Sequence, residues 1–164
     1  MQNTAIEQRV HRVLDDLGMS YEAIPIDPHY ADTAAFCEHY GFPLDHSANT
    51  IIIGSKKEPK HYCACVILAT TRLDVNHMVR RLMGVSRASF ASAEETMVLT
   101  GMLIGGVTVF ALPPDLPIYI DAPIMSLGYV ILGGGSRALK IKVAPEALRR
   151  LPHVRIVAGL GVGV

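Results

Sequence analysis

The sequence predicts an α+β fold, with helices flanking a curved, mixed, mostly antiparallel sheet or partial barrel. Three observations favour this class. The chain has 164 residues and 50% of them are hydrophobic, which suits the buried core of one domain spanning residues 1–164. Helix-like and strand-like segments follow one another without the strict β-α-β alternation of parallel sheets. No linker rich in proline or serine and no internal repeat divides the chain.

The composition narrows the classes of partner and the expected location. Fifteen basic and fifteen acidic residues give a net charge of zero, whereas chains that coat nucleic acid carry a basic excess, so we expect no DNA partner. No apolar run reaches the ~20 residues of a transmembrane helix, and the mixed start of the chain predicts no signal peptide, so we expect no membrane partner. Three cysteines without a framework spacing favour a reducing compartment, with the cytoplasm as the expected location.

Helical spacing and capping residues define most elements of the first half. Apolar residues recur at helical spacing over residues 4–17. Asp32 and Asp74 stand at N-cap positions, and Ser92 with Glu95 forms a capping box. The expected elements are helices 4–17, 33–40, 75–83 and 93–100 and strands 21–26, 50–54 and 62–70, the last two joined as a hairpin.

The second half is rich in residues that favour strands. Pro145 suits the first turn of a short helix that opens at 144–146. The glycine-rich run 159–163 superficially resembles a dinucleotide-binding loop. No helix follows it to hold a pyrophosphate, so we expect a frayed tail. The expected strands are 107–112, 117–121, 129–133, 139–143 and 154–157.

Two adjacent glycines, Gly105 and Gly106, lie where a helix gives way to the predicted strand 107–112. Without Cβ atoms they allow backbone N–H groups to point into a cavity. Such donors can polarise a carbonyl oxygen as it becomes an oxyanion. The alternative is a bulge or a tight start to the strand, which is the commoner reason for such a pair taken alone.

A second glycine cluster, 133–135, leads into Ser136 and Arg137. It could place Ser136, Arg137 and Lys140 beside a ligand, or it could be a flexible hairpin turn. In the strand that follows, Lys140 takes the face opposite to that of its two apolar neighbours. We therefore expect the Lys140 side chain to be solvated.

His61, Cys63 and Cys65 alternate along one predicted strand and so share a face. Imidazole and thiolate groups bind zinc, but neighbours at this spacing splay too far apart to surround an ion alone. A buried face of small residues is the simpler interpretation, as a helix core is for Cys37. We expect no metal and no other cofactor.

Basic residues form two groups that could contact phosphates. For a chain without net charge, an ordinary solvated surface is the simpler interpretation. The groups are Lys56, Lys57 and Lys60 in the hairpin, and Arg72, Arg80, Arg81 and Arg87 around the helix 75–83.

Five segments carry a resemblance to a known family. In order along the chain they are Asn49–Ile53 (NTIII), Arg72–Asp74 (RLD), Thr100–Val107 (TGMLIGGV), Leu116–Asp121 (LPIYID) and Gly134–Leu139 (GGSRAL). Their order and spacing resemble the YbaK/prolyl-tRNA-synthetase-associated domain family of aminoacyl-tRNA deacylases. The resemblance covers nearly the whole chain, and its most specific part is the TGxxxGG block followed by LPIYID and the glycine cluster.

The resemblance implies a freestanding editing domain. Such a domain hydrolyses the ester between a wrong amino acid and the terminal ribose of a tRNA, without a metal or a covalent intermediate. Gly105 and Gly106 would hold the aminoacyl carbonyl, while Asn49, Ser136 and Lys140 would line the site. A neighbouring tRNA hydroxyl would help to activate water, and the pocket would sort amino acids by size. The implied partners are aminoacyl-tRNA and an aminoacyl-tRNA synthetase.

Three positions depart from the pattern of the family. Asn49 stands where the family commonly has a lysine that engages the tRNA end. Lys140 stands where it often has an aspartate, and Ile24 where some members have a tyrosine. Lys140 could replace the charge lost at Asn49, or it could repel the α-ammonium group of the substrate. The alternative function is therefore a binding module without turnover, for a tRNA end, an amino-acid-like ligand or a synthetase.

Overall fold

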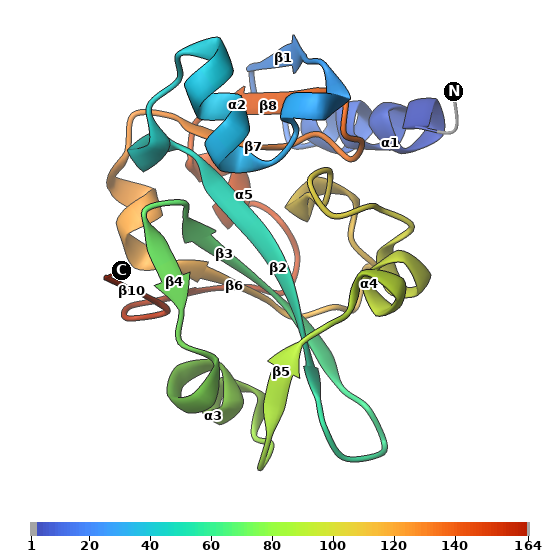
Figure 1. Ribbon diagram of the computed structural model, residues 1–164, viewed down its shortest axis with the longest axis vertical. Helices are drawn as coiled ribbons and strands as arrows, with labels where there is room; N and C mark the ends of the chain where they lie inside the picture. Colours follow the sequence, from blue (N-terminus) through green and yellow to red (C-terminus); the bar gives the residue numbers. More distant parts are fainter. Residues whose placement is uncertain (1–2, 164) are drawn as a thin grey trace.

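A five-stranded sheet dominates the computed structural model, which describes residues 3–163 (Figure 1). Its strands lie in the order β5 (Ala88–Phe90), β2 (Ala48–Ser55), β3 (Tyr62–Leu68), β6 (Ile118–Asp121) and β9 (Val154–Val157). β2 pairs antiparallel with β3 and β5, whereas β3 with β6 and β6 with β9 are parallel pairs. The β-branched run Thr50–Ile53 favours the long β2 strand, and the polar segment 56–61 turns the chain back as β3.

A second sheet of three antiparallel strands packs above β2. It consists of β1 (Tyr21–Pro25), β8 (Leu139–Val143) and β7 (Val130–Gly133), with β8 in the centre. A separate antiparallel pair joins β4 (Thr71–Leu73) to β10 (Gly161–Gly163). Helices and mixed strand pairings together confirm the predicted α+β class, and the sheets do not close into a barrel.

The helices begin and end largely where local signals predict. Ser92 accepts a hydrogen bond from the Glu95 N–H, and the Glu95 carboxylate accepts one from the Ser92 N–H, so the predicted capping box forms. The Asp74 carboxylate caps the next turn by accepting from the His77 N–H. The helices are α1 (Asn3–Asp16), α2 (Thr33–Tyr40), α3 (Arg80–Met83), α4 (Ala93–Thr100) and α5 (Glu146–Arg149), with a wider π-turn, Val75–Val79, before α3.

The strand predicted over 107–112 is wrong. The segment contains a single 3₁₀ turn, Val109–Ala111, which opens with the Thr108 hydroxyl accepting from the Phe110 N–H. Its apolar side chains are buried in the main core. Burial rather than sheet pairing therefore accounts for this apolar run, and periodicity alone does not separate the two cases.

The frayed tail predicted over 159–163 is also wrong, because the run continues into β10. The Leu160 N–H donates to the Asp121 carboxylate at 3.2 Å. A Cβ on Gly161 would lie 2.6 Å from the Thr71 hydroxyl, so glycine permits this close approach. The glycines here serve strand packing.

The core forms on both faces of the five-stranded sheet. The main cluster lies between the two sheets, and a second cluster lies under the opposite face, on the side of α3. Cys63 and Cys65 are buried in that second cluster, where a hydrogen bond between the two thiols and burial raise the pKa of Cys65.

Within residues 3–163, no helix has the length and apolarity to cross a membrane, and no cluster of three or more metal-ligating side chains occurs.

Candidate functional site

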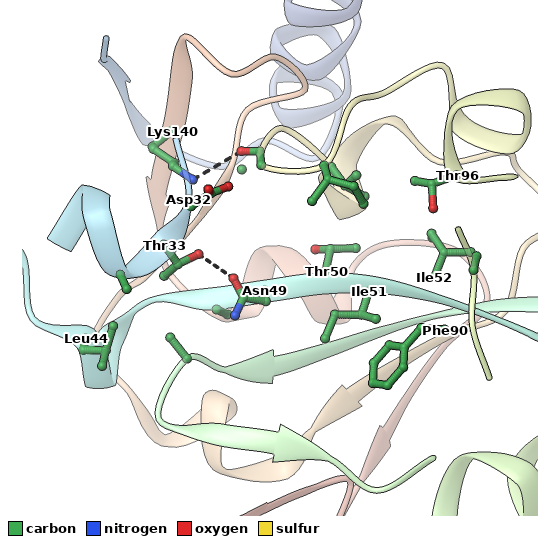
Figure 2. Close-up of a pocket in the computed structure, with 18 residues that line it drawn as sticks. Asp32, Thr33, Leu44, Asn49, Thr50, Ile51, Ile52, Phe90, Thr96 and Lys140 are labelled. Carbon is green, nitrogen blue, oxygen red and sulfur yellow. Dashed lines mark hydrogen bonds between the residues drawn. The ribbon is translucent and has the colours of Figure 1, made fainter. Parts of the chain in front are cut away.

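A cavity of about 550 Å³ opens between β2 and the loop that precedes residue 107 (Figure 2). β2 forms one wall with residues 48–52. The opposite wall consists of Ile104, Gly105 and Val107, together with Lys140 from β8. Asp32 and Thr33, at the start of α2, close one end, and Thr96 of α4 lies at the other. The site therefore combines segments that are far apart in the sequence.

Three of the predicted site residues meet in this cavity, and three do not line it. Asn49, Gly105 and Lys140 are lining residues. Gly106, Ser136 and Ile24 lie behind the wall, as described next. Only the fold brings the first three together, because they come from β2, the loop and β8.

Gly106, Ser136 and Ile24 make contacts that support the wall. The Gly106 N–H donates to the Leu103 carbonyl at 2.9 Å, and a Cβ on Gly106 would lie 2.6 Å from the Ser136 backbone. The Ser136 hydroxyl donates to the Glu7 carboxylate and accepts from the Ala138 N–H. Ile24 packs against the small apolar cluster around Phe36.

The expectation that the Lys140 side chain is solvated is wrong, because Lys140 is only 5% exposed. Alternation along the strand places it on the face opposite to Leu139 and Ile141, as expected, but α2 and the 3₁₀ turn before it cover that face. The Lys140 ammonium donates to the Ala31 carbonyl at 2.6 Å and to the Gly105 carbonyl at 3.5 Å. It also lies 5.4 Å from the centre of the Phe36 ring.

Burial lowers the pKa of Lys140 to about 8, although the nearby Asp32 carboxylate acts in the opposite direction. The group therefore remains mostly protonated at neutral pH. A charged ammonium in this wall strengthens its bonds to the two carbonyl oxygens.

Arg137 also stabilises the loop wall, from the side of the loop opposite to Lys140. Its guanidinium donates to the Ile104 carbonyl at 2.7 Å and to the Pro28 carbonyl at 3.1 Å. It also pairs with the Asp32 carboxylate at 3.3 Å. The sequence predicts only an N-cap role for Asp32, yet its side chain makes no capping bond, because the carboxylate faces Arg137 instead.

Together these bonds orient the peptide groups around Gly105. The Ile104 and Gly105 carbonyls point at Arg137 and Lys140, respectively. In a trans peptide the N–H points away from the preceding carbonyl, so the Gly105 N–H points away from Arg137. That N–H donates to no atom of residues 3–163. A positive φ of 95° at Gly105 makes this conformation unfavourable for other residues.

Two polar side chains of β2, those of Asn49 and Thr50, line the cavity. The Asn49 side-chain oxygen accepts a hydrogen bond from the Thr33 hydroxyl (Figure 2). The Thr50 hydroxyl is buried and has no partner within the described residues. Thr33, Thr50 and Thr96 were not singled out from the sequence, since nothing in their spacing indicates that they share a cavity.

Comparisons with known proteins agree with this architecture. The chain is 21% identical to a proposed trans-editing enzyme for prolyl-tRNA synthetase, with a TM-score of 0.82 over 98% of this chain and 99% of that one. It is 25% identical to a protein described as hypothetical, with a TM-score of 0.79 over 94% and 99% of the two chains. A scaffold protein from a study of computational epitope grafting has the same fold at 20% identity, with a TM-score of 0.80.

The family is settled by the sequence match rather than by these structural likenesses. The model of the aminoacyl-tRNA editing domain matches residues 27–151, which contain both walls of the cavity. The match confirms the family predicted from the ordered motifs. This chain belongs to the aminoacyl-tRNA editing domain family.

Proposed function

We propose that this protein is a deacylase that hydrolyses the ester of mischarged aminoacyl-tRNA in the cavity between β2 and the Gly105 loop. The observation that carries the proposal is the Gly105 N–H, which is held at the cavity wall without an acceptor. Family membership supports an editing role. The departures at Asn49 and Lys140 give this member a pocket chemistry of its own.

Gly105 would bind the reacting carbonyl. Its N–H would donate to the ester oxygen, which gains negative charge as water attacks the carbonyl carbon. Lys140 and Arg137 fix the flanking carbonyl groups, so the donor would not need to reorganise during the reaction. Placement of this donor is thus the main contribution of the loop wall.

Water is the nucleophile that fits the lining. Among the residues that the structure describes, the lining holds two titratable side chains, Asp32 and Lys140, and neither a cysteine nor a histidine. Lys140 is mostly protonated at neutral pH and is a poor base there. The ribose hydroxyl beside the ester would orient the water, and the ribose oxygen would leave with a proton as the amino acid is released.

The two ends of the cavity would treat the substrate differently. Ile52 and Val107 present apolar walls that sort side chains by size. Asp32 is the carboxylate of the lining that an α-ammonium group would meet, at the end of the cavity where Arg137 and Lys140 also lie.

Deacylation of a panel of mischarged tRNAs tests the proposal. We expect hydrolysis of at least one by the wild type and a loss of about 100-fold or more in Gly105→Ala, because a Cβ there would lie 2.2 Å from Arg137 Nη1. Gly128→Ala is the matched control, since a Cβ at Gly128 meets nothing within 4 Å. An inactive wild type across the panel, or a fully active Gly105→Ala, would contradict the proposal.

A binding module without turnover is the second candidate. It is favoured by the absence of a lysine at position 49, where Asn49 is already engaged with Thr33. It predicts retention of tRNA, or of a synthetase, without release of the amino acid, and tRNA retention that weakens with salt. Turnover of any mischarged tRNA would exclude it.

The cellular location is part of the same proposal. All three cysteines, Cys37, Cys63 and Cys65, are buried and free. Free buried thiols suit a reducing compartment, and we propose the cytoplasm.

A further inference from the structure

We propose that the outer side of β2 and the edge strand β5 form a nucleoside-binding strip for the 3′ end of the tRNA, with Phe90 as its stacking platform. The strip is defined by Leu44, Ile51 and Phe90. This inference rests on the proposed function, because it says how the alcohol half of the ester is held.

The cavity has an inner and an outer part, separated by β2. Thr50 and Ile52 point into the inner part, toward the Gly105 loop, whereas Ile51 and Phe90 lie on the other side of the strand (Figure 2). Both parts belong to the same 550 Å³ space. An acyl group bound at Gly105 would fill only the inner part. Since the two halves of an ester are joined covalently, the outer part would take the ribose and its base.

Phe90 has the properties of a stacking platform. It is 59% exposed at the mouth of the cavity, and Leu44 beside the same space is 40% exposed. Exposed apolar side chains that gather at a cavity mark interaction sites. Every nucleobase has a flat face that stacks on an aromatic ring, and single-stranded ends offer that face freely.

Cations continue the strip along β5 toward the hairpin. Arg87 precedes Phe90 by three residues, about 10 Å at the rise of a strand. The Lys56 N–H donates to the Arg87 carbonyl at 3.0 Å, which places the hairpin beside it. A second cavity of about 210 Å³ lies here, lined by Lys57, His61 and Arg87 with one carboxylate, Glu58.

These cations are available to phosphates. Within residues 3–163, Lys56, Lys57 and Arg87 form no salt bridge, whereas Lys60 is paired with Glu95 at 3.1 Å. With the terminal base on Phe90, the preceding phosphates would pass Arg87 and the hairpin. The apolar strip and the cations thus follow one direction along the free edge of the sheet.

Binding of short RNA separates stacking from simple surface effects. The probes are a non-aminoacylated RNA hairpin with a single-stranded CCA end and a shortened form of the same hairpin with a blunt end, which offers no unpaired base. We expect Phe90→Ala to bind the full probe about 5- to 150-fold more weakly than the wild type, and Phe90→Trp to bind it as tightly. On the shortened probe, the wild type and Phe90→Ala should bind equally. If Phe90→Ala lost the same affinity for both probes, or lost none for either, Phe90 would not be a stacking platform.

The cationic part has its own variant and control. Arg87→Gln should weaken binding of both probes and reduce the slope of log K against log salt by about 0.7. Arg155→Gln is the matched control, because Arg155 is exposed on β9 at the opposite edge of the sheet. The same slope in Arg87→Gln and the wild type would overturn the phosphate path.

Hydrolysis distinguishes failure of the strip from failure of the proposed function. If the strip is right, Phe90→Ala raises KM for mischarged tRNA but leaves hydrolysis of an amino-acid ethyl ester unchanged. An active enzyme whose KM for tRNA does not move in Phe90→Ala or Phe90→Leu overturns the strip and leaves the deacylase standing. A wild type that binds RNA through Phe90 but hydrolyses nothing supports the strip and overturns the deacylase.

Discussion

The two walls of the cavity are built by different physical means. The β2 wall is held by a regular ladder to β3 that runs from Ala48 to Gly54. The loop wall around Gly105 has no such ladder: Gly106 makes isolated backbone bonds, and the Ile104 and Gly105 carbonyls accept side-chain bonds from Arg137 and Lys140. One wall is therefore held by a continuous backbone ladder, whereas the other also needs two cations.

This difference indicates how each wall responds to substitution. A side-chain change on β2 leaves the ladder intact, so it alters the shape or polarity of the cavity locally. A change at Arg137 releases the Ile104 carbonyl, which shares a peptide group with the Gly105 N–H, and a change at Lys140 releases the Gly105 carbonyl of the next peptide group in the loop. We therefore expect the loop wall to control the rate of hydrolysis and the strand wall to control selectivity.

The largest effect is expected for Lys140→Met. Lys140 joins the Ala31 carbonyl to the Gly105 carbonyl, so its loss should let the loop shift away from the start of α2 and carry the Gly105 N–H out of place, which would lower kcat about 100- to 1000-fold, the usual cost of one oxyanion donor. The free energy of unfolding should change by less than about 2 kcal/mol, since relief of a buried charge offsets the lost bonds. Lys142→Met, on the same strand face but over the Tyr129 ring, is the control. If kcat fell by a similar factor in Lys140→Met and Lys142→Met, the rate would not depend specifically on the bonds that Lys140 makes to the loop wall.

The pH dependence of stability should also trace to Lys140. Its folded pKa of about 8 lies below the ordinary 10.5, so between these values the unfolded chain holds a proton that the folded chain has released. The free energy of unfolding should then rise with pH across that window, by about 3 kcal/mol relative to Lys140→Met. Urea unfolding of both proteins from below pH 8 to above pH 10.5 measures the difference. If the free energies of unfolding of the wild type and Lys140→Met changed in parallel with pH, the burial of the Lys140 charge would not be a distinguishing property of the loop wall.

Arg137→Lys should have a smaller effect of the same kind. A lysine keeps the charge but cannot reach Ile104, Pro28 and Asp32 at once, as the planar guanidinium does. We expect kcat for a mischarged tRNA to fall about 10- to 100-fold with KM nearly unchanged. A change confined to KM would mean that Arg137 binds substrate rather than positioning the loop.

The smallest effect is expected on the strand wall, for Thr50→Val. The Thr50 hydroxyl is buried without a partner in the described structure, so an isosteric methyl removes an unpaired polar group. The free energy of unfolding should rise by about 1 kcal/mol and kcat should change by less than about threefold. Thermal unfolding and deacylation assays measure both, and a loss of rate like that of Lys140→Met would abolish the contrast.

Short-range signals in the sequence predicted much of this fold. The capping box at Ser92 and the cap at Asp74 act within one turn, and the hairpin between β2 and β3 depends on adjacent strands. Wrong predictions fall where long-range packing decides: the segment 107–112 is apolar because it is buried, and 159–163 pairs with β4.

The sequence by itself determined the helices, most strands, the family and three of the residues that line the cavity, Asn49, Gly105 and Lys140. Only the tertiary structure decided which of them face one another. A strand pattern shows that Lys140 and Leu139 take opposite faces, but not that α2 covers the second face. Likewise, two adjacent glycines look equivalent in the sequence. The Leu103 carbonyl accepts from the Gly106 N–H, and Arg137 and Lys140 donate to the Ile104 and Gly105 carbonyls, so the Gly105 N–H alone is left free within residues 3–163; these partners converge only when the chain is folded.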